Sequence, residues 1–223
     1  MLRSLLTTVL ILVSVVGTGS PFLPQTSNDL ARPLSLSQVW TLDATYTDRQ
    51  HGVTFRYPAT WESTTQFAYH PPALTISDSK PIAGFGYSEG GFPRGRAIGP
   101  YTRTNLEGVG IVYSAVPVRS AAKCESKAAS LSDSPKHSQA VFGERSFSVY
   151  KTGDGGMSQY IEGNLYAIYL GRICYLFETD VATASPAALD DIPALTTAQY
   201  RDIDKHLLEI MKSVRVSPTT HIP

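Results

Sequence analysis

Cysteine is scarce in this 223-residue chain, which contains only Cys124 and Cys174. No cysteine lies near the N-terminus, which argues against a lipid anchor there, and neither forms a recognisable catalytic motif with a histidine. An even number of cysteines in an exported protein favours a disulfide, with two free thiols as the alternative. Closing a loop of about 50 residues would contribute ~4 kcal/mol in the chain-entropy model.

Net charge is also absent, because 19 basic and 19 acidic side chains cancel and no block of like charges occurs. A dedicated nucleic-acid-binding domain would carry a basic excess. A protein of the membrane surface would carry a polybasic segment. We therefore expect neither nucleic acid nor a membrane surface as a partner.

Metal and cofactor motifs are missing as well. The histidines show no i, i+4 pair or other metal-ligand spacing; they are His51, His70, His137, His206 and His221. Residues 153–156 lack the alternating Asp or Asn ligands and the terminal Glu of a calcium loop. Gly84 and Gly86 have no third glycine at the dinucleotide spacing. The sequence thus predicts no metal and no cofactor.

The one long apolar run, residues 5–16, follows Arg3 and precedes the small residues 17–19. A helix of that length rises about 18 Å, too little for a bilayer core of about 30 Å. The pattern is typical of a secretory signal peptide, with a retained membrane anchor as the alternative. Export to the periplasm or cell exterior is expected, with no stable membrane span after processing.

The rest of the chain is long enough for one domain with its own core. Residues 20–38 are rich in Pro and Ser and predict a flexible leader. The expected division is a signal peptide at 1–19, the leader at 20–38, a single domain at 39–217 and a tail at 218–223.

Strand patterns fill much of this domain. Val53, Phe55 and Tyr57 alternate with polar residues before Pro58 ends the strand. Further strand candidates are residues 73–76, 82–87, 110–118, 146–151, 157–162, 165–170 and 173–178. Residues 153–156 are expected to form a turn. Gly171 suits a two-residue type II′ hairpin that pairs Leu170 with Ile173 at the centre of the sheet.

Helical patterns are fewer. A short helix is expected over residues 120–131, and a longer one over 197–214, where Thr196 and Gln199 form a capping box. An apolar stripe along the longer helix predicts packing on a sheet. Its members are Ile203, Leu207, Ile210, Met211 and Val214.

Residues 86–90 match the G-x-S-x-G pattern of a serine hydrolase, with Ser88 as the nucleophile. Asp154 or Asp180, followed by His206, would complete a triad in the required order. The helix that should follow the serine is missing, because residues 91–95 are rich in Gly and Pro. An extracytoplasmic serine hydrolase therefore stays an alternative, and enzymatic activity is not expected.

The long loop over residues 90–103 is the expected binding surface for a partner, since Arg and aromatic residues are favoured at interface hot spots. The candidate contacts are Phe92, Arg94, Arg96, Tyr101 and Arg103. A solvated loop without a partner is the alternative.

Two segments resemble PsbP-like domains. Residues 48–61 (DRQHGVTFRYPATW) are similar to the Gly-apolar-x-Phe-x-Tyr-Pro-x-x-Trp opening of that family, and residues 207–216 resemble its final helix and short strand. The resemblance implies an α+β fold, an antiparallel sheet of six or seven strands between helices in an α/β/α sandwich. Its members include a photosystem II subunit, a Ran-binding factor and exported bacterial proteins, so it implies non-catalytic binding.

The leading hypothesis is an exported, non-catalytic binding or accessory domain for an envelope or extracellular protein. A small apolar-ligand carrier is a further alternative, which an apolar cavity of ~300 Å³ or more would favour.

Overall fold

The fold is given by a computed structural model that describes residues 34–63, 81–88, 100–101, 104–155, 159–185 and 192–217. The helices in these segments are α1 (Leu36–Trp40), α2 (Ala121–Ala129) and α3 (Thr197–Ser213). The strands are β1 (Ala44–Asp48), β2 (Val53–Tyr57), β3 (Glu62–Ser63), β4 (Ala83–Ser88), β5 (Leu106–Pro117), β6 (His137–Phe142), β7 (Arg145–Gly155), β8 (Gln159–Leu170), β9 (Ile173–Ala184) and β10 (Arg215–Val216).

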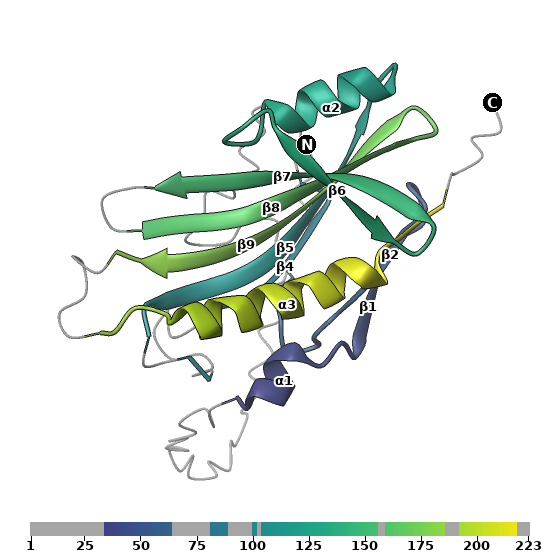
Figure 1. Ribbon diagram of the computed structural model, residues 1–223. Helices are drawn as coiled ribbons and strands as arrows, with labels where there is room; N and C mark the ends of the chain where they lie inside the picture. The colour runs from purple at the N-terminus through teal and green to yellow at the C-terminus, as the bar shows by residue number, and fades with distance from the viewer. Residues whose placement is uncertain are drawn as a thin grey trace, which may run out of the picture.

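The strands form two antiparallel sheets (Figure 1). The larger has seven strands in the order β3-β4-β5-β9-β8-β7-β6, and the smaller has the order β1-β2-β10. Long strands β5, β8 and β9 lie inside the larger sheet, as their apolar character predicts. The predicted α+β fold, an antiparallel sheet with helices packed on it, is confirmed.

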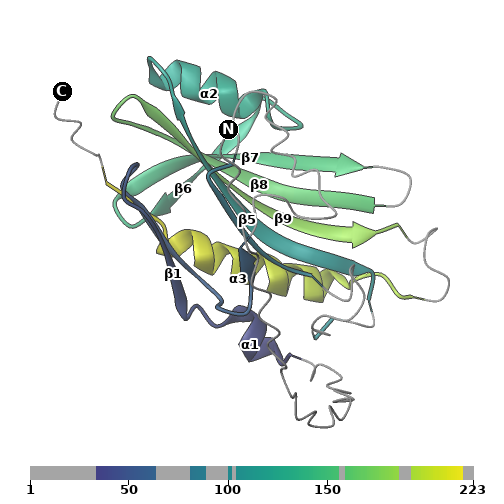
Figure 2. The same ribbon diagram turned by 180° about the vertical axis from the view of Figure 1, so that it is seen from behind.

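Opposite faces of the large sheet are covered by different elements, as Figures 1 and 2 show together. One face packs with α3 and the small sheet around buried aromatic residues that include Phe55, Tyr113 and Phe177. The other face carries α2, which packs through Cys124 and Ala128. The described chain is therefore layered, with the large sheet in the middle.

The hairpin between β8 and β9 has the predicted register, with Leu170 opposite Ile173 and Ile168 opposite Tyr175. The predicted turn type is wrong. Gly171 has φ of 58° and Arg172 has φ of 67°. Positive φ at both central residues defines a type I′ turn, whereas type II′ has it only at the first.

Strands β7 and β8 are longer than the sequence indicated. The predicted turn at 153–156 is wrong, because β7 continues through Gly155. Residues 157–162 and 165–170 were predicted as two strands, but β8 is continuous from Gln159 to Leu170. Pairing between β7 and β8 keeps Gly153 and Gly155 in a strand, although their local sequence favours a turn.

Both predicted helices are present. Thr196 and Gln199 form the capping box at the start of α3, and the apolar stripe of this helix is buried. Helix α1 begins at Leu36, inside the segment expected to be a leader, and is started by a capping box at Ser35. The strand expected at 73–76 lies outside the described residues.

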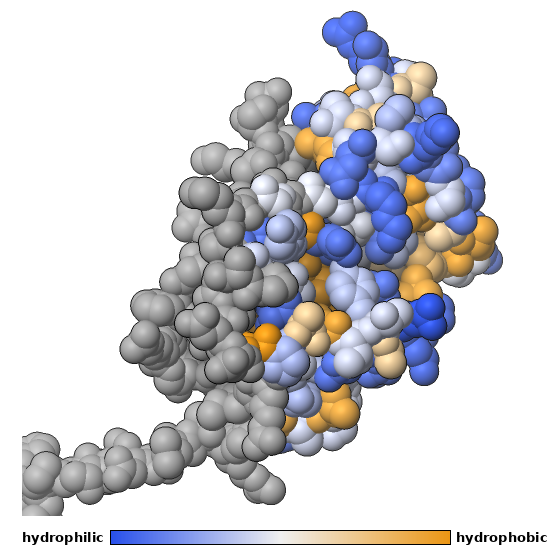
Figure 3. All heavy atoms as spheres, turned by 60° about the vertical axis from the view of Figure 1, so that its left-hand side comes forward, coloured by the Kyte–Doolittle hydropathy of each residue, from blue (hydrophilic) through white to orange (hydrophobic). Residues whose placement is uncertain are grey.

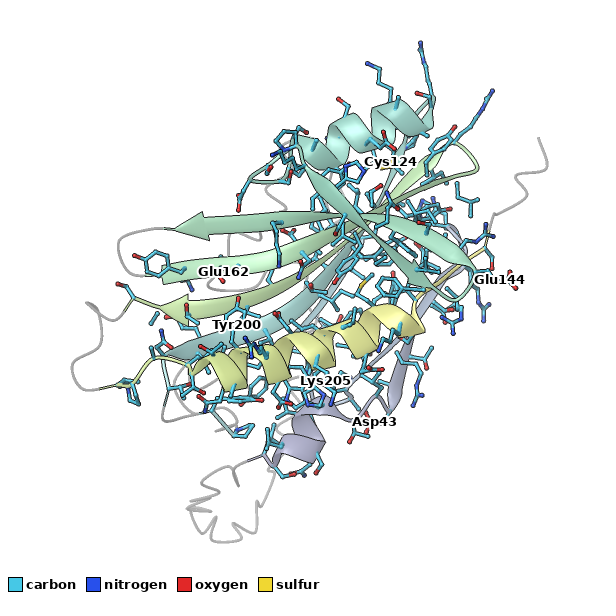
Figure 4. All side chains as sticks on the ribbon, viewed as in Figure 1. Asp43, Cys124, Glu144, Glu162, Tyr200 and Lys205 are labelled. Atoms are coloured by element: carbon cyan, nitrogen blue, oxygen red, sulfur yellow. A yellow bond between two sulfur atoms is a disulfide. The ribbon has the colours of Figure 1, made fainter. Side chains whose placement is uncertain are left out.

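The predicted cysteine pair is bonded. Cys124 of α2 and Cys174 of β9 form a disulfide with Cα atoms 5.2 Å apart, so it joins the helix to the sheet (Figure 4). Among the described residues, no helix is long and apolar enough to cross a membrane.

Candidate functional site

A groove of about 610 Å³ lies between β7, β8 and the first half of α3. Gly153 and Gly155 of β7 are paired with Glu162 and Tyr160 of β8. Opposite residues of an antiparallel pair share a face, so β7 presents two positions without side chains beside two large ones. The missing side chains hollow out this part of the sheet.

Helix α3 closes one side of the groove. Tyr200 and Asp204 are four residues apart and therefore lie on the same face of the helix, toward β8. Figure 4 shows Tyr200 and Glu162 next to each other at this side of the sheet, and the Tyr200 hydroxyl donates a hydrogen bond to Glu162 Oε2 over 3.0 Å. This bond ties α3 to β8 across the groove.

Burial and charge shift the titration of these groups. Burial raises the pKa of Tyr200 well above its usual value, and its hydrogen bond to Glu162 acts in the same direction. Burial also raises the pKa of Asp204; the Lys151 ammonium opposes that rise and the charge of Glu162 adds to it. Tyr200 therefore stays protonated, and acts as a hydrogen-bond donor, at neutral pH.

Both charge signs line the groove. Lys151 of β7 is opposite Asn164 of β8, two residues before the pair formed by Gly153 and Glu162. Asp133 reaches the groove from the segment after α2, and its Oδ2 is 2.9 Å from the point where a Cβ on Gly153 would lie. The lining thus includes one ammonium, one amide, two phenols and three carboxylates.

A half-buried acid, whose carboxyl Oδ1 is fully buried, lies behind the floor of the groove. Asp180 of β9 is opposite Gly163 of β8, and burial raises the pKa of its carboxyl to about 7. A Cβ on Gly163 would be 2.5 Å from Asp180 Oδ1 and 2.9 Å from Thr152 Oγ1. Glycine at 163 is what lets these two buried oxygens approach the strand.

A smaller cavity of about 230 Å³ adjoins the groove and shares Tyr200 and Glu162 with it. Its other side is held by Asn105, whose amide group donates to the Ala184 carbonyl and accepts from the Leu195 N–H, each over 2.8 Å. Both polar ends of this amide are thus occupied by backbone, so Asn105 fixes the chain that leads into α3.

The residues of the alternative catalytic triad are not brought together. Ser88 of β4 and Asp154 of β7 are separated by three strands of the large sheet. The pairs that connect them are Ser88 with Gly108, Gly108 with Ala182, Ala182 with Ile161, and Ile161 with Asp154. Four inter-strand steps of about 4.8 Å place Ser88 and Asp154 roughly 19 Å apart. His206 lies on α3, where its ring stacks on Trp40 with centroids 4.7 Å apart.

The predicted partner surface lies mostly outside the described residues: this applies to Phe92, Arg94, Arg96 and Arg103. Tyr101 is described, and it is only 4% exposed. Its hydroxyl accepts a hydrogen bond from Trp40 Nε1 over 3.4 Å, which makes it part of the core beside α1. The role of the loop in binding stays a prediction.

Histidine and acidic residues form no cluster suited to a metal ion within the described segments. His51 Nδ1 is 2.6 Å from Asp48 Oδ2, and the same oxygen accepts a hydrogen bond from the Tyr113 hydroxyl over 3.3 Å. Tyr175 donates to the His51 carbonyl over 3.0 Å. This arrangement fastens the β1–β2 turn to the large sheet.

Sequence reasoning did not find the groove residues. They are Asp133, Lys151, Tyr160, Glu162, Asn164, Tyr200 and Asp204. The available signal was Gly153 and Gly155 at alternate positions, which mark a hollow once they are placed in a strand. Because residues 153–156 were predicted to form a turn, the sequence did not indicate the groove.

No family model and no curated protein matches this sequence. Solved structures that are similar over most of its length include three with the following values. Mycobacterium tuberculosis LpqN, involved in cell envelope biogenesis, has 9% identity and a TM-score of 0.40, with 84% of this chain and 90% of that chain covered. The Saccharomyces cerevisiae Ran-binding protein Mog1p has 8% identity and a TM-score of 0.44, with 79% and 96% covered. A mutant of Mog1 has 9% identity and a TM-score of 0.42, with 76% and 93% covered. Likeness at this level assigns neither family nor function, so the resemblance to PsbP-like domains stays a prediction.

Proposed function

We propose that this protein is an exported binding or accessory domain that holds a polar ligand or partner in the groove between α3, β7 and β8, without transforming it chemically. The observation that carries the proposal is the groove itself. A cavity of about 610 Å³ with a few converging polar groups falls within the usual range of ligand sites, about 300–1,000 Å³.

Two features support export. The N-terminal residues 1–19 have the pattern of a secretory signal peptide. The Cys124–Cys174 disulfide fits an oxidising compartment, because such bonds persist outside the cytosol. The periplasm or the cell exterior is therefore the proposed location.

The chemistry of the groove supports binding rather than turnover. The raised pKa of Tyr200 removes the phenolate as a base, and its hydroxyl is already bonded to Glu162. The roughly 19 Å between Ser88 and Asp154 disfavours the serine hydrolase. Polar lining disfavours the carrier of an apolar ligand.

A second contact surface remains part of the proposal. The loop at 90–103 would bind a protein of the envelope or the extracellular space through Phe92, Arg94, Arg96 and Arg103. Changing Arg94 and Arg96 together to Ala should weaken capture of that partner. Unchanged capture by the double variant would remove the loop from the account.

Site-specific photo-crosslinking tests the groove directly. A photoreactive derivative of phenylalanine, which keeps an aromatic ring, replaces Tyr160 at the groove rim, which is 48% exposed, or Val141 on β6, which is 68% exposed and outside the cavity. In producing cells, irradiation should give a discrete adduct in the exported fraction with the probe at 160 and none with the probe at 141. No adduct at 160, or the same adduct at both positions, would refute the proposed site.

A further inference from the structure

The groove carries more information than its size, because an exposed aromatic ring stands beside hydrogen-bonding groups of both kinds. We infer that its ligand is a saccharide, bound with one sugar face on Tyr160 and its hydroxyls on the polar lining. This inference rests on the proposed binding function and specifies the chemical class of the ligand.

Tyr160 supplies the stacking surface. A Cβ on Gly155 would lie 3.2 Å from Tyr160 Cδ1 and 3.4 Å from Cε1, so the ring leans over the glycine. The ring is held at the rim of the cavity while almost half of the residue remains open to solvent. An exposed aromatic face of this kind suits the C–H face of a sugar ring, which is apolar although its hydroxyls are not.

The polar lining suits hydroxyl groups. A hydroxyl both donates and accepts, so one sugar can donate to the carboxylates of Asp133 and Asp204 and accept from Lys151 and the Asn164 amide. A simple anion would be repelled by the three carboxylates, and a simple cation would leave the donors of Lys151 and Asn164 without an acceptor. A neutral ligand with many hydroxyls can donate to the carboxylates and accept from the ammonium and the amide, without bringing a charge of its own into the groove.

The hollow in β7 gives such a ligand room. Glycines inside a strand weaken it, and they often mark a place where a ligand comes close to the backbone. Gly153 and Gly155 occur at alternate positions on the face that carries Tyr160 and Glu162. Side chains at both positions would fill the space next to the aromatic ring.

Titration of the full, disulfide-bonded mature protein with tetrasaccharides tests the inference. The probes are cellotetraose, chitotetraose and maltotetraose, and the readout is the backbone amide NMR spectrum. At least one should shift amides of β7, β8 and the first half of α3. Tyr160→Ala should weaken that affinity about tenfold, whereas Tyr160→Phe should stay within about twofold because the ring remains.

Val141→Ala is the control, because this exposed side chain lies on β6 outside the groove. Its affinity should equal that of the wild type. Failure of all three saccharides to shift groove amides would overturn the inference, as would equal binding by Tyr160→Ala. So would groove shifts caused by spermidine or inorganic phosphate alone.

The crosslinking experiment separates the two proposals. If saccharides fail but crosslinking at 160 still succeeds, the ligand class is wrong and the binding function stands. If both fail, the function is wrong as well.

Discussion

At the scale of single residues, Gly163 connects the core of the sheet with the groove. A Cβ at this position would clash with the Thr179 carbonyl oxygen, besides its contacts with Asp180 and Thr152. Backbone cannot move aside as the end of a flexible side chain can. The position therefore tolerates no side chain unless β8 and β9 separate locally.

Gly163→Ala should accordingly lower the free energy of unfolding by about 1–3 kcal/mol, the usual cost of overpacking. Gly153→Ala is the matched control, since its closest contact is the end of the Asp133 side chain at 2.9 Å. Urea unfolding of both variants measures the difference. Equal losses for the two would contradict the close approach at Gly163.

The second residue-scale prediction concerns pH and Asp180. Its carboxyl has a pKa of about 7 in the folded state against 3.8 ordinarily, because burial disfavours the charge. The folded state therefore keeps a proton that the unfolded state releases, and the resulting stability declines as the pH rises from about 4 to about 7.

Asp180→Asn removes this decline. Relative to the wild type, the variant should gain about 1–3 kcal/mol more stability at pH 7.5 than at pH 5. Denaturant unfolding at the two pH values measures this difference, and comparison of the two proteins cancels the titrating groups that do not interact with Asp180. A difference that is independent of pH would show that Asp180 is ionised in the folded protein.

At the scale of the elements, the sequence predicted what local pattern controls. Helix α3 follows from its capping box and apolar stripe, and β2 from the alternation that ends at Pro58. The extension of β7 through Gly153 and Gly155 depends on pairing with β8. Such pairing cannot be predicted from local turn propensity. The groove was missed for the same reason, since its residues come from four separate segments.

The β8–β9 turn gives a prediction at this scale. Arg172 adopts φ of 67°, in the left-handed region that only glycine enters without strain. Arg172→Gly should raise the free energy of unfolding by about 0.5–1 kcal/mol, because relief of strain exceeds the added entropy of the unfolded chain.

Arg49→Gly is the control for this change. Arg49 also lies in an exposed turn, between β1 and β2, but it is not among the residues with positive φ. Thermal unfolding measures both variants, and Arg49→Gly should lose stability or stay unchanged. A loss of stability in Arg172→Gly would contradict the strain that we assign to the turn.

At the scale of the whole molecule, the disulfide holds α2 against the central strands. Cys124 and Cys174 are both buried, and they pack with Ala128, Leu165 and Leu176 on the face opposite α3. The helix has only nine residues, so packing alone gives it a small contact area. The covalent link compensates for that.

Replacing both cysteines with serine should lower the free energy of unfolding by about 2–4 kcal/mol. Because the groove lies on the face covered by α3, its amide NMR pattern should survive in the folded double variant. Chemical unfolding and the NMR spectrum together test this. Stability equal to that of the wild type would mean that the bond adds nothing to the fold.

The central claim is that an exported domain holds its ligand in the groove of α3, β7 and β8. Amide hydrogen exchange tests it most directly, by comparing protein purified from the exported fraction with the same protein refolded free of ligand. We predict slower exchange in the exported sample along Lys151, Glu162 and the first half of α3, with α2 unchanged. Identical exchange in the two samples, or protection confined to other elements, would contradict the account.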